Sequence, residues 1–305
     1  MSLTLKQLRY FSALAETLHF GRAAKLCHVT QPALSMQIRD LEANLGVVLV
    51  ERGSSGLLLT DQGHEIARRA HDILVAVQDL SELAAHRHHP LAGRLRLGVI
   101  PSVGPYLLPK ILPEIHQTYP ELKFSLRESQ TEHLIDDLVD GHLDLLILAL
   151  PVLSEGIETL ALFDDGFSVA LPPDHNLAGR AEIHQDELGG EHLLLLEEGH
   201  CLREQALAVC QSVRTDEFRA SSLATVIQMV ANGYGVTILP ALALPVEVGD
   251  ESDIKVVPFA KPEPKRTIGL AWRRSSPHKP VFAEFGEFVQ IRVGSILDLK
   301  LTSGA

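Results

Sequence analysis

Hydrophobic residues in the first 60 positions recur at helical spacing in three short stretches. Thr30 stands where the N-cap of the third stretch is expected, and Gly46 follows its last apolar residue. Only Cys27-His28-Val29 separates the second stretch from the third, which is the length of a helix-turn-helix corner. The pattern predicts three helices with these apolar positions: Leu5, Leu8, Phe11, Leu14 and Ala15; Ala23, Ala24 and Cys27; Ala33, Leu34, Ile38, Leu41 and Leu45.

Two short apolar runs follow these helices, at residues 47–50 and 57–59, on either side of Gly53-Ser54-Ser55-Gly56. Short apolar runs around a glycine-bounded turn predict a β-hairpin. Together with the three helices, the hairpin predicts an α-rich winged helix-turn-helix domain over residues 1–60.

Residues 61–85 contain no proline and no glycine beyond Gly63, and their apolar positions follow a heptad register. A helix with one apolar seam needs a surface that covers it, so we expect a linker helix over residues 61–90 that dimerises. The alternative is a helix that packs on its own domain. The run His86-Arg87-His88-His89-Pro90 ends the pattern and marks the domain boundary. We interpret its histidines as solvent-exposed rather than metal-binding, because they lack a regular ligand spacing. The seam consists of Ile66, Ala70, Ile73, Val77, Leu80 and Ala84.

Residues 91–305 alternate between strand-like and helix-like segments. The continuous apolar run at residues 143–150 is typical of a buried parallel strand. A second series follows from residue 191. The alternation predicts an α/β domain of two lobes with a ligand cleft between them. The predicted strands are 95–100, 122–126, 143–150, 236–239 and 267–272, and the predicted helices of the first series are 106–119 and 132–139.

Composition narrows the class of protein. Hydrophobic residues make up 46% of the chain and charged residues 22%, which indicates packed domains rather than disorder. No run of about 18 apolar residues and no secretory leader is present, so we expect a cytoplasmic protein without a membrane partner. The sequence holds no Walker loop, no nucleophile elbow and no zinc signature. It therefore predicts no cofactor, no metal and no conventional enzyme active site.

The net charge of −12 would by itself argue against a nucleic-acid partner. The charge is unevenly distributed, however, because residues 1–60 carry six Lys or Arg against four Asp or Glu. An acidic protein with such an N-terminal domain can contact DNA through that domain alone.

The N-terminal segment from Leu8 to Gly63 resembles the DNA-binding domain of LysR-type transcriptional regulators. The similarity lies in residues 20–24 (FGRAA), 31–35 (QPALS) and 59–63 (LTDQG). The third helix presents polar side chains that can reach base edges and phosphates in a major groove, although each one taken singly fits a solvated helix face equally well. The family commonly has basic residues in the wing, whereas here Arg52 is followed by Gly-Ser-Ser-Gly. The predicted DNA contacts are Gln31, Pro32, Ser35, Gln37, Arg39 and Arg52.

Three cysteines, Cys27, Cys201 and Cys210, are too few for a disulfide scaffold. We interpret Cys27 as a buried small hydrophobe. Cys201 starts a predicted helix and Cys210 lies nine residues further on, so their Cα atoms would be about 13.5 Å apart, whereas a disulfide needs about 7 Å or less. A bond between them would require this helix to unfold. A thiol at a helix N-terminus can also have a lowered pKa. The residues alone leave a redox sensor and a structural role equally open.

Further motifs resemble the hydrogen peroxide-sensing branch of the LysR-type regulators. They are residues 98–109 (GVIPSVGPYLLP), Gln130-Thr131, residues 199–203 (GHCLR) with Cys210, and residues 261–270 (KPEPKRTIGL). The resemblance implies that peroxide oxidises Cys201 to a sulfenic acid and that Cys210 resolves it as an intramolecular disulfide. It also implies that Ser102 and Thr131 hold the peroxide, that His200 flanks the thiol and that Arg266 supports its charge. Members of this branch commonly have threonine at the position that Ser102 occupies in this chain.

The resemblance implies a peroxide-sensing transcriptional activator of the oxidative stress response with a two-lobed, periplasmic-binding-protein-like effector domain. It also implies assembly as a homotetramer that is a dimer of dimers. Its partners would be double-stranded promoter DNA, hydrogen peroxide and RNA polymerase. One alternative keeps the fold but makes the protein a metabolite-responsive LysR-type regulator with structural cysteines. Another is a thiol peroxidase, which would leave the helix-turn-helix unexplained.

Overall fold

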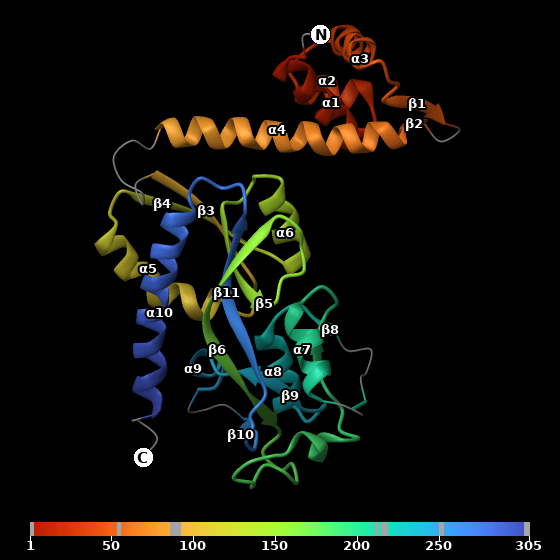
Figure 1. Ribbon diagram of the computed structural model, residues 1–305. Helices are drawn as coiled ribbons and strands as arrows, with labels where there is room; N and C mark the ends of the chain where they lie inside the picture. Colours follow the sequence, from red (N-terminus) through yellow and green to blue (C-terminus); the bar gives the residue numbers. More distant parts are fainter. Residues whose placement is uncertain are drawn as a thin grey trace. The chain divides into compact units, whose positions relative to one another are not determined.

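The computed structural model describes residues 3–53, 56–85, 93–210, 213–214, 219–249 and 253–301 (Figure 1). The chain divides into two compact units, Met1–Arg87 and His88–Ala305. Each unit has its own hydrophobic core, and each is described by itself below. The histidines of the predicted linker, at positions 86, 88 and 89, lie outside the described residues.

Three capped helices form the core of the N-terminal unit, which confirms the prediction from the apolar spacing. Thr4 and Gln7 cap the first helix reciprocally, and the backbone N–H of Ala33 donates to Thr30 Oγ1 at the start of the third. Gly46 ends the third helix in the left-handed conformation, with φ of 71°. Cys27 is half-buried at the C-cap of the second helix rather than fully buried as predicted. The helices are α1 (Leu5–Thr17), α2 (Phe20–Leu26) and α3 (Gln31–Leu45).

The wing is an antiparallel hairpin of β1 (Val50–Gly53) and β2 (Gly56–Leu59). The first strand begins at Val50 rather than at residue 47, because neighbouring side chains take up the backbone groups before it: Leu49 N–H donates to Glu42, and Thr60 Oγ1 donates to Val48 O. Leu49 itself is fully buried in the core. A Cβ at Gly63 would lie 2.1 Å from the Leu49 carbonyl oxygen, so only glycine fits there.

The helix α4 covers Asp61–Ala85 without interruption, as the heptad pattern predicts. Its first half packs on the core of the N-terminal unit, to which the helix belongs, through Ile66 and Ala67. Further along the same seam, Ile73 is 42% exposed and Leu80 is 66% exposed within the single chain. The alternative interpretation, packing on its own domain, therefore describes the first half of the helix, and the dimerising role of the second half stays a prediction.

The C-terminal unit contains a seven-stranded sheet in the order β10-β6-β11-β5-β3-β4, with β9 paired to β6. Its first lobe alternates strands and helices, and β3 lies parallel to both β4 and β5. These elements agree with the predicted ones to within two residues. They are β3 (Gly93–Val99), α5 (Gly104–Thr118), β4 (Leu122–Glu128), α6 (Thr131–Val139) and β5 (Leu145–Leu150).

Two long strands, β6 (Ile157–Leu171) and β11 (Lys265–Arg273), lead from the first lobe into the second (Figure 1). The first part of β6 pairs with β11 and its last part with β9 and β10, so the two lobes share one strand. The helix α10 (Lys279–Leu301) packs on β6 and β11. The second lobe comprises η1 (Gln185–Leu188), β7 (Leu195–Leu196), α7 (Cys201–Val209), β8 (Arg219–Ala220), α8 (Leu223–Ala231), β9 (Thr237–Pro240), α9 (Leu244–Glu247) and β10 (Lys255–Pro258).

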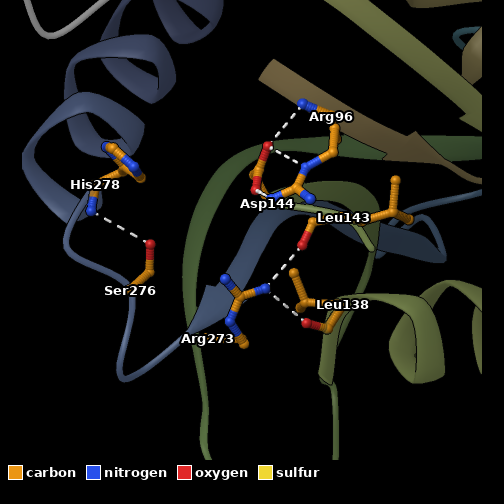
Figure 2. Close-up of polar contacts among 7 residues, drawn as sticks. All are labelled: Arg96, Leu138, Leu143, Asp144, Arg273, Ser276 and His278. Atoms are coloured by element: carbon orange, nitrogen blue, oxygen red, sulfur yellow. Dashed lines mark hydrogen bonds and ion pairs between the residues drawn. The ribbon is translucent and has the colours of Figure 1, made fainter. Parts of the chain in front are cut away.

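Two arginines, the buried Arg273 and the half-buried Arg96, fasten the first lobe at the end of α6 (Figure 2). Arg273 Nη1 donates to the carbonyl oxygens of Leu138 at 2.8 Å and Leu143 at 2.9 Å. Asp144 accepts hydrogen bonds from the backbone and side chain of Arg96 and forms an ion pair with it. The last carbonyls of a helix have no partner inside the helix, so Arg273 stabilises the C-terminal end of α6. The first residue of α6 lies in the candidate site described below.

No helix among the described residues is long and apolar enough to span a membrane.

Candidate functional site

A narrow pocket lies between the two lobes of the C-terminal unit. The lining brings together four of the residues that the sequence predicts for the site: Ser102, Thr131, His200 and Cys201. The pocket leaves no room for a water-sized molecule in this structure, so any ligand requires a small movement of its walls. The remaining lining residues are Ile100, Pro101, Gln130 and Leu202.

Arg266 reaches the pocket through Ser102 and is not itself part of the lining. Its Nη1 donates to Ser102 Oγ at 2.8 Å and its Nη2 to the Ser102 carbonyl at 3.0 Å. The guanidinium also pairs with Asp165 at 2.9 Å, and both side chains are almost completely buried. Asp165 accepts a further bond from the backbone N–H of Leu242. The pair fixes the Ser102 hydroxyl in the pocket wall.

Thr131 is the first residue of α6, and its Oγ1 is buried without a hydrogen-bond partner in the described part of the chain. The preceding residue, Gln130, donates from Nε2 to the Glu198 carbonyl across the pocket at 3.0 Å. A Cβ at Gly199 would lie 2.3 Å from Gln130 Oε1, so the glycine before His200 lets the two lobes approach. The site thus contains a buried hydroxyl that is ready for a small polar ligand.

The helix α7 begins at Cys201 and has Cys210 as its C-cap, which confirms the predicted helix between the cysteines. Both thiols are free. Nine residues of helix separate their Cα atoms by about 13.5 Å, too far for a disulfide, which needs about 7 Å or less. His200 holds the N-cap position with its side chain buried, and its Nε2 lies 3.6 Å from Glu197 Oε1. The cysteines cannot join while α7 stays folded.

The two thiols have different surroundings. Cys201 is half-buried and lines the pocket, whereas Cys210 is 2% exposed in the core of the second lobe. Burial raises the pKa of Cys210 to about 11. At neutral pH the Cys210 thiol is therefore protonated and shielded, and it becomes a nucleophile only when α7 opens.

The predicted DNA contacts of the third helix occupy its outer face. Gln31, Pro32 and Arg39 are exposed, whereas Ser35 and Gln37 are half-buried. Gln37 Nε2 also donates to Asp40 at 3.4 Å, a weak bond that does not hold the amide firmly. The side chain of Arg52 in the wing lies outside the described part of the structure.

Among the described residues, no group of three or more His, Cys, Asp or Glu side chains is arranged to hold a metal ion.

Comparison with known families covers both units. Residues 5–64 match the bacterial regulatory helix-turn-helix proteins of the LysR family, and residues 88–293 match the LysR substrate binding domain. A relative from Escherichia coli (strain K12), the DNA-binding transcriptional dual regulator OxyR, is 44% identical over 302 residues, which cover 98% of this chain and 99% of the relative. The chain belongs to the LysR family, in its OxyR group.

Solved structures of the OxyR group share this fold. A full-length cysteine-to-aspartate variant of OxyR from Pseudomonas aeruginosa is 39% identical, with a TM-score of 0.75 and 95% of each chain covered. A hydrogen peroxide-bound OxyR variant from Corynebacterium glutamicum is 35% identical, with a TM-score of 0.67, and covers 100% of this chain and 98% of its own.

Two residues of this OxyR-group site were not predicted from the sequence. Asp165 balances the charge of Arg266, and Gln130 joins the lobes beside the thiol. The adjacent Asp164-Asp165 in an otherwise apolar stretch was the available signal for the first, because a buried carboxylate needs a cationic partner. Gln130 belongs to the Gln130-Thr131 motif of the sequence analysis, but no residue pattern in the sequence indicates its contact with Glu198.

Alkylation of the native protein by iodoacetamide at pH 8 is expected to modify Cys201 well before Cys210. With its pKa raised to about 11, Cys210 is ionised to roughly one part in a thousand at pH 8. Its labelling should increase as the pH rises toward 11, and it should match that of Cys201 in urea. Peptide mass spectrometry measures both rates, and equal labelling of the two cysteines in the folded protein would contradict the assigned burial.

Proposed function

We propose that this chain is a hydrogen peroxide-responsive, DNA-binding transcriptional regulator that is switched by a reversible Cys201–Cys210 disulfide. The observation that carries the proposal is the pocket, in which the Cys201 thiol lies with Ser102, His200 and the unpartnered hydroxyl of Thr131. Hydroxyl and imidazole groups suit a ligand as small and polar as hydrogen peroxide. The similarity to a peroxide-bound OxyR variant supports the same ligand.

In the first chemical step, the Cys201 thiolate attacks one oxygen of hydrogen peroxide and the O–O bond breaks. The sulfur becomes a sulfenic acid, and the departing hydroxide takes up a proton to form water. In the second step, the Cys210 thiolate attacks this sulfur, the disulfide forms, and a second water leaves. Peroxide is thereby reduced to two waters while two thiols are oxidised. Ser102 and Thr131 orient the peroxide, and Arg266 holds Ser102.

Formation of the disulfide couples this chemistry to a change of shape. Because the helix keeps its terminal cysteines too far apart, α7 must unfold before they join. Leu202 and Ala206 of α7 are buried in the core of this unit, so opening the helix costs the free energy of exposing them. A bond formed at such a cost is also comparatively easy to reduce, which makes the switch reversible.

Mass spectrometry of the full chain before and after one equivalent of hydrogen peroxide tests the proposal. We expect the mass to fall by two hydrogen atoms, with Cys201 and Cys210 joined and Cys27 still free. Unchanged thiols would refute the proposal and favour a regulator that responds to a metabolite. Repeated consumption of peroxide in the presence of a reductant, without any change in DNA binding, would instead indicate a thiol peroxidase.

The N-terminal unit supports binding to double-stranded promoter DNA through α3 and the wing. Exposed Gln31 and Arg39 suit a base edge and a phosphate, and the E. coli relative is described as DNA-binding. The exposed part of the α4 seam, at Ile73 and Leu80, supports pairing with a second copy. We extend the proposal to a cytoplasmic homotetramer, a dimer of dimers that acts with RNA polymerase.

Replacing Arg39 by alanine is expected to weaken promoter binding and to reduce its salt dependence. Each lost phosphate contact lowers the slope of log affinity against log salt concentration by about 0.9. Fluorescence anisotropy at several salt concentrations measures the slope. Lys255→Ala, which removes an exposed cation on β10 of the C-terminal unit, is the matched control and should leave it unchanged. An unaltered slope in Arg39→Ala would exclude a phosphate contact by Arg39.

A further inference from the structure

The thiol pocket is assembled from two lobes that meet there. The first lobe supplies the hydroxyls of Ser102 and Thr131, and the second supplies His200 and Cys201. The separation of the lobes therefore sets the distance between the reacting sulfur and the groups that hold the peroxide. Because the pocket is too narrow for a water-sized molecule, a small change in this separation decides which molecules enter.

Tyr106 crosses from the first lobe to the second. It lies in the first turn of α5, four residues after Ser102, and the residue is 4% exposed. Tyr106 Oη donates to Glu247 Oε1 at 2.6 Å, and Glu247 is the last residue of α9 in the second lobe. Burial, together with the adjacent carboxylate, raises the pKa of the Tyr106 phenol, so the phenol remains a donor. A short bond to a charged acceptor is among the stronger hydrogen bonds in proteins.

The segment of residues 102–106 is held at its other end as well. Ser102 accepts from Arg266, which pairs with Asp165, and Asp165 accepts from the backbone N–H of Leu242. Leu242 lies two residues before α9, the helix that carries Glu247. Both ends of the segment are thus tied to residues 242–247 of the second lobe, which leaves it little freedom to move away from Cys201.

We propose that the Tyr106–Glu247 hydrogen bond sets the width of the thiol pocket and thereby makes the site select hydrogen peroxide over bulkier organic hydroperoxides. This inference rests on the proposed peroxide-sensing function. Tyr106 does not line the pocket and acts as a positioning residue. When the bond is lost, the lobes can separate, hydrogen peroxide is oriented less well, and a larger hydroperoxide gains access.

The test compares the second-order rate constants for Cys201 oxidation by hydrogen peroxide and by tert-butyl hydroperoxide in the full chain. For Tyr106→Phe we expect the ratio of the two rate constants to fall about tenfold, the effect of losing one hydrogen bond to a charged group. Glu247→Ala should reproduce the fall. Glu247→Gln keeps an acceptor for the phenol, so this variant should retain most of the ratio measured for the unmodified protein.

Tyr119→Phe is the matched control. Tyr119 follows the other end of α5, and its Oη donates to Glu284 of α10 at 3.0 Å, so the variant removes the same kind of bond without touching the contact between the lobes. It should leave the ratio unchanged.

Three results would overturn the inference. An unchanged ratio in both Tyr106→Phe and Glu247→Ala shows that the Tyr106–Glu247 bond does not set the preference for hydrogen peroxide. Equal losses with the two peroxides show that the bond only stabilises the fold. If Cys201 of the unmodified protein reacts with hydrogen peroxide no faster than N-acetylcysteine, the proposed function fails and this inference fails with it.

Discussion

Replacement of Cys201 by serine is expected to abolish the response to hydrogen peroxide while promoter binding persists. Serine is nearly the same size, so α7 should still begin at this position, and stability should change by no more than about 1 kcal/mol. The hydroxyl is a poor nucleophile at neutral pH and forms no disulfide. DNase footprints recorded before and after one equivalent of peroxide should be identical for this variant and should differ for the unmodified protein.

Two further cysteine variants make this result specific. Cys27→Ser, in the N-terminal unit, should respond to peroxide normally, because Cys27 belongs to a different unit from the thiol pocket. Cys210→Ser should stop at the sulfenic acid, which dimedone traps and mass spectrometry detects. A Cys201→Ser protein whose footprint still shifts with peroxide would show that the switch does not depend on this thiol.

The parts of the fold that the sequence predicts well are those whose signals are local. Thr30 caps α3 and Gly46 ends it, and both signals lie within the residues they act on. The helix between the cysteines likewise follows from its own residues, so the spacing of Cys201 and Cys210 is enough to predict that a disulfide and an intact helix are incompatible.

The strand β6 was not predicted although it is the longest in the sheet. It runs for 15 residues, about three times the usual length of a strand, and its polar Asp164-Asp165-Gly166 interrupts the apolar pattern. The strand also pairs with β11 over its first part and with β9 and β10 over its last, and its register with β11 shifts at Ile268/Gly269. No single periodicity describes a strand that serves two lobes.

The contacts that complete the site join residues far apart in the sequence. Arg266 and Asp165 are 101 positions apart, and Tyr106 and Glu247 are 141 apart. Periodicity and capping rules describe neighbours, so they give no sign of such pairs. The resemblance to a known family supplied Ser102, Thr131 and Arg266 as individual residues. Only the structure shows that Arg266 acts on the pocket through Ser102 and that its charge is balanced by Asp165.

Replacement of Arg266 by methionine is expected to destabilise the C-terminal unit by about 3–5 kcal/mol, because it leaves the buried carboxylate of Asp165 without its cation. Among the described residues, Asp165 would keep the backbone N–H of Leu242 as its hydrogen-bond donor. Trp272 is the only tryptophan of the chain and is buried in β11, so its fluorescence during urea unfolding reports on this unit. The unfolding midpoint should fall clearly below that of the unmodified protein.

The double variant Arg266→Met/Asp165→Asn separates the unpaired charge from the lost packing. It removes both charges, so its midpoint should recover a large part of the loss, since a buried pair often contributes little net stability. Peroxide should nevertheless oxidise Cys201 more slowly in the single and the double variant than in the unmodified protein. In both variants Ser102 has lost the donor that fixes its hydroxyl. If the single and double variants unfold at the same midpoint, the destabilisation does not arise from the charge on Asp165, and the pair only fills space between β6 and β11.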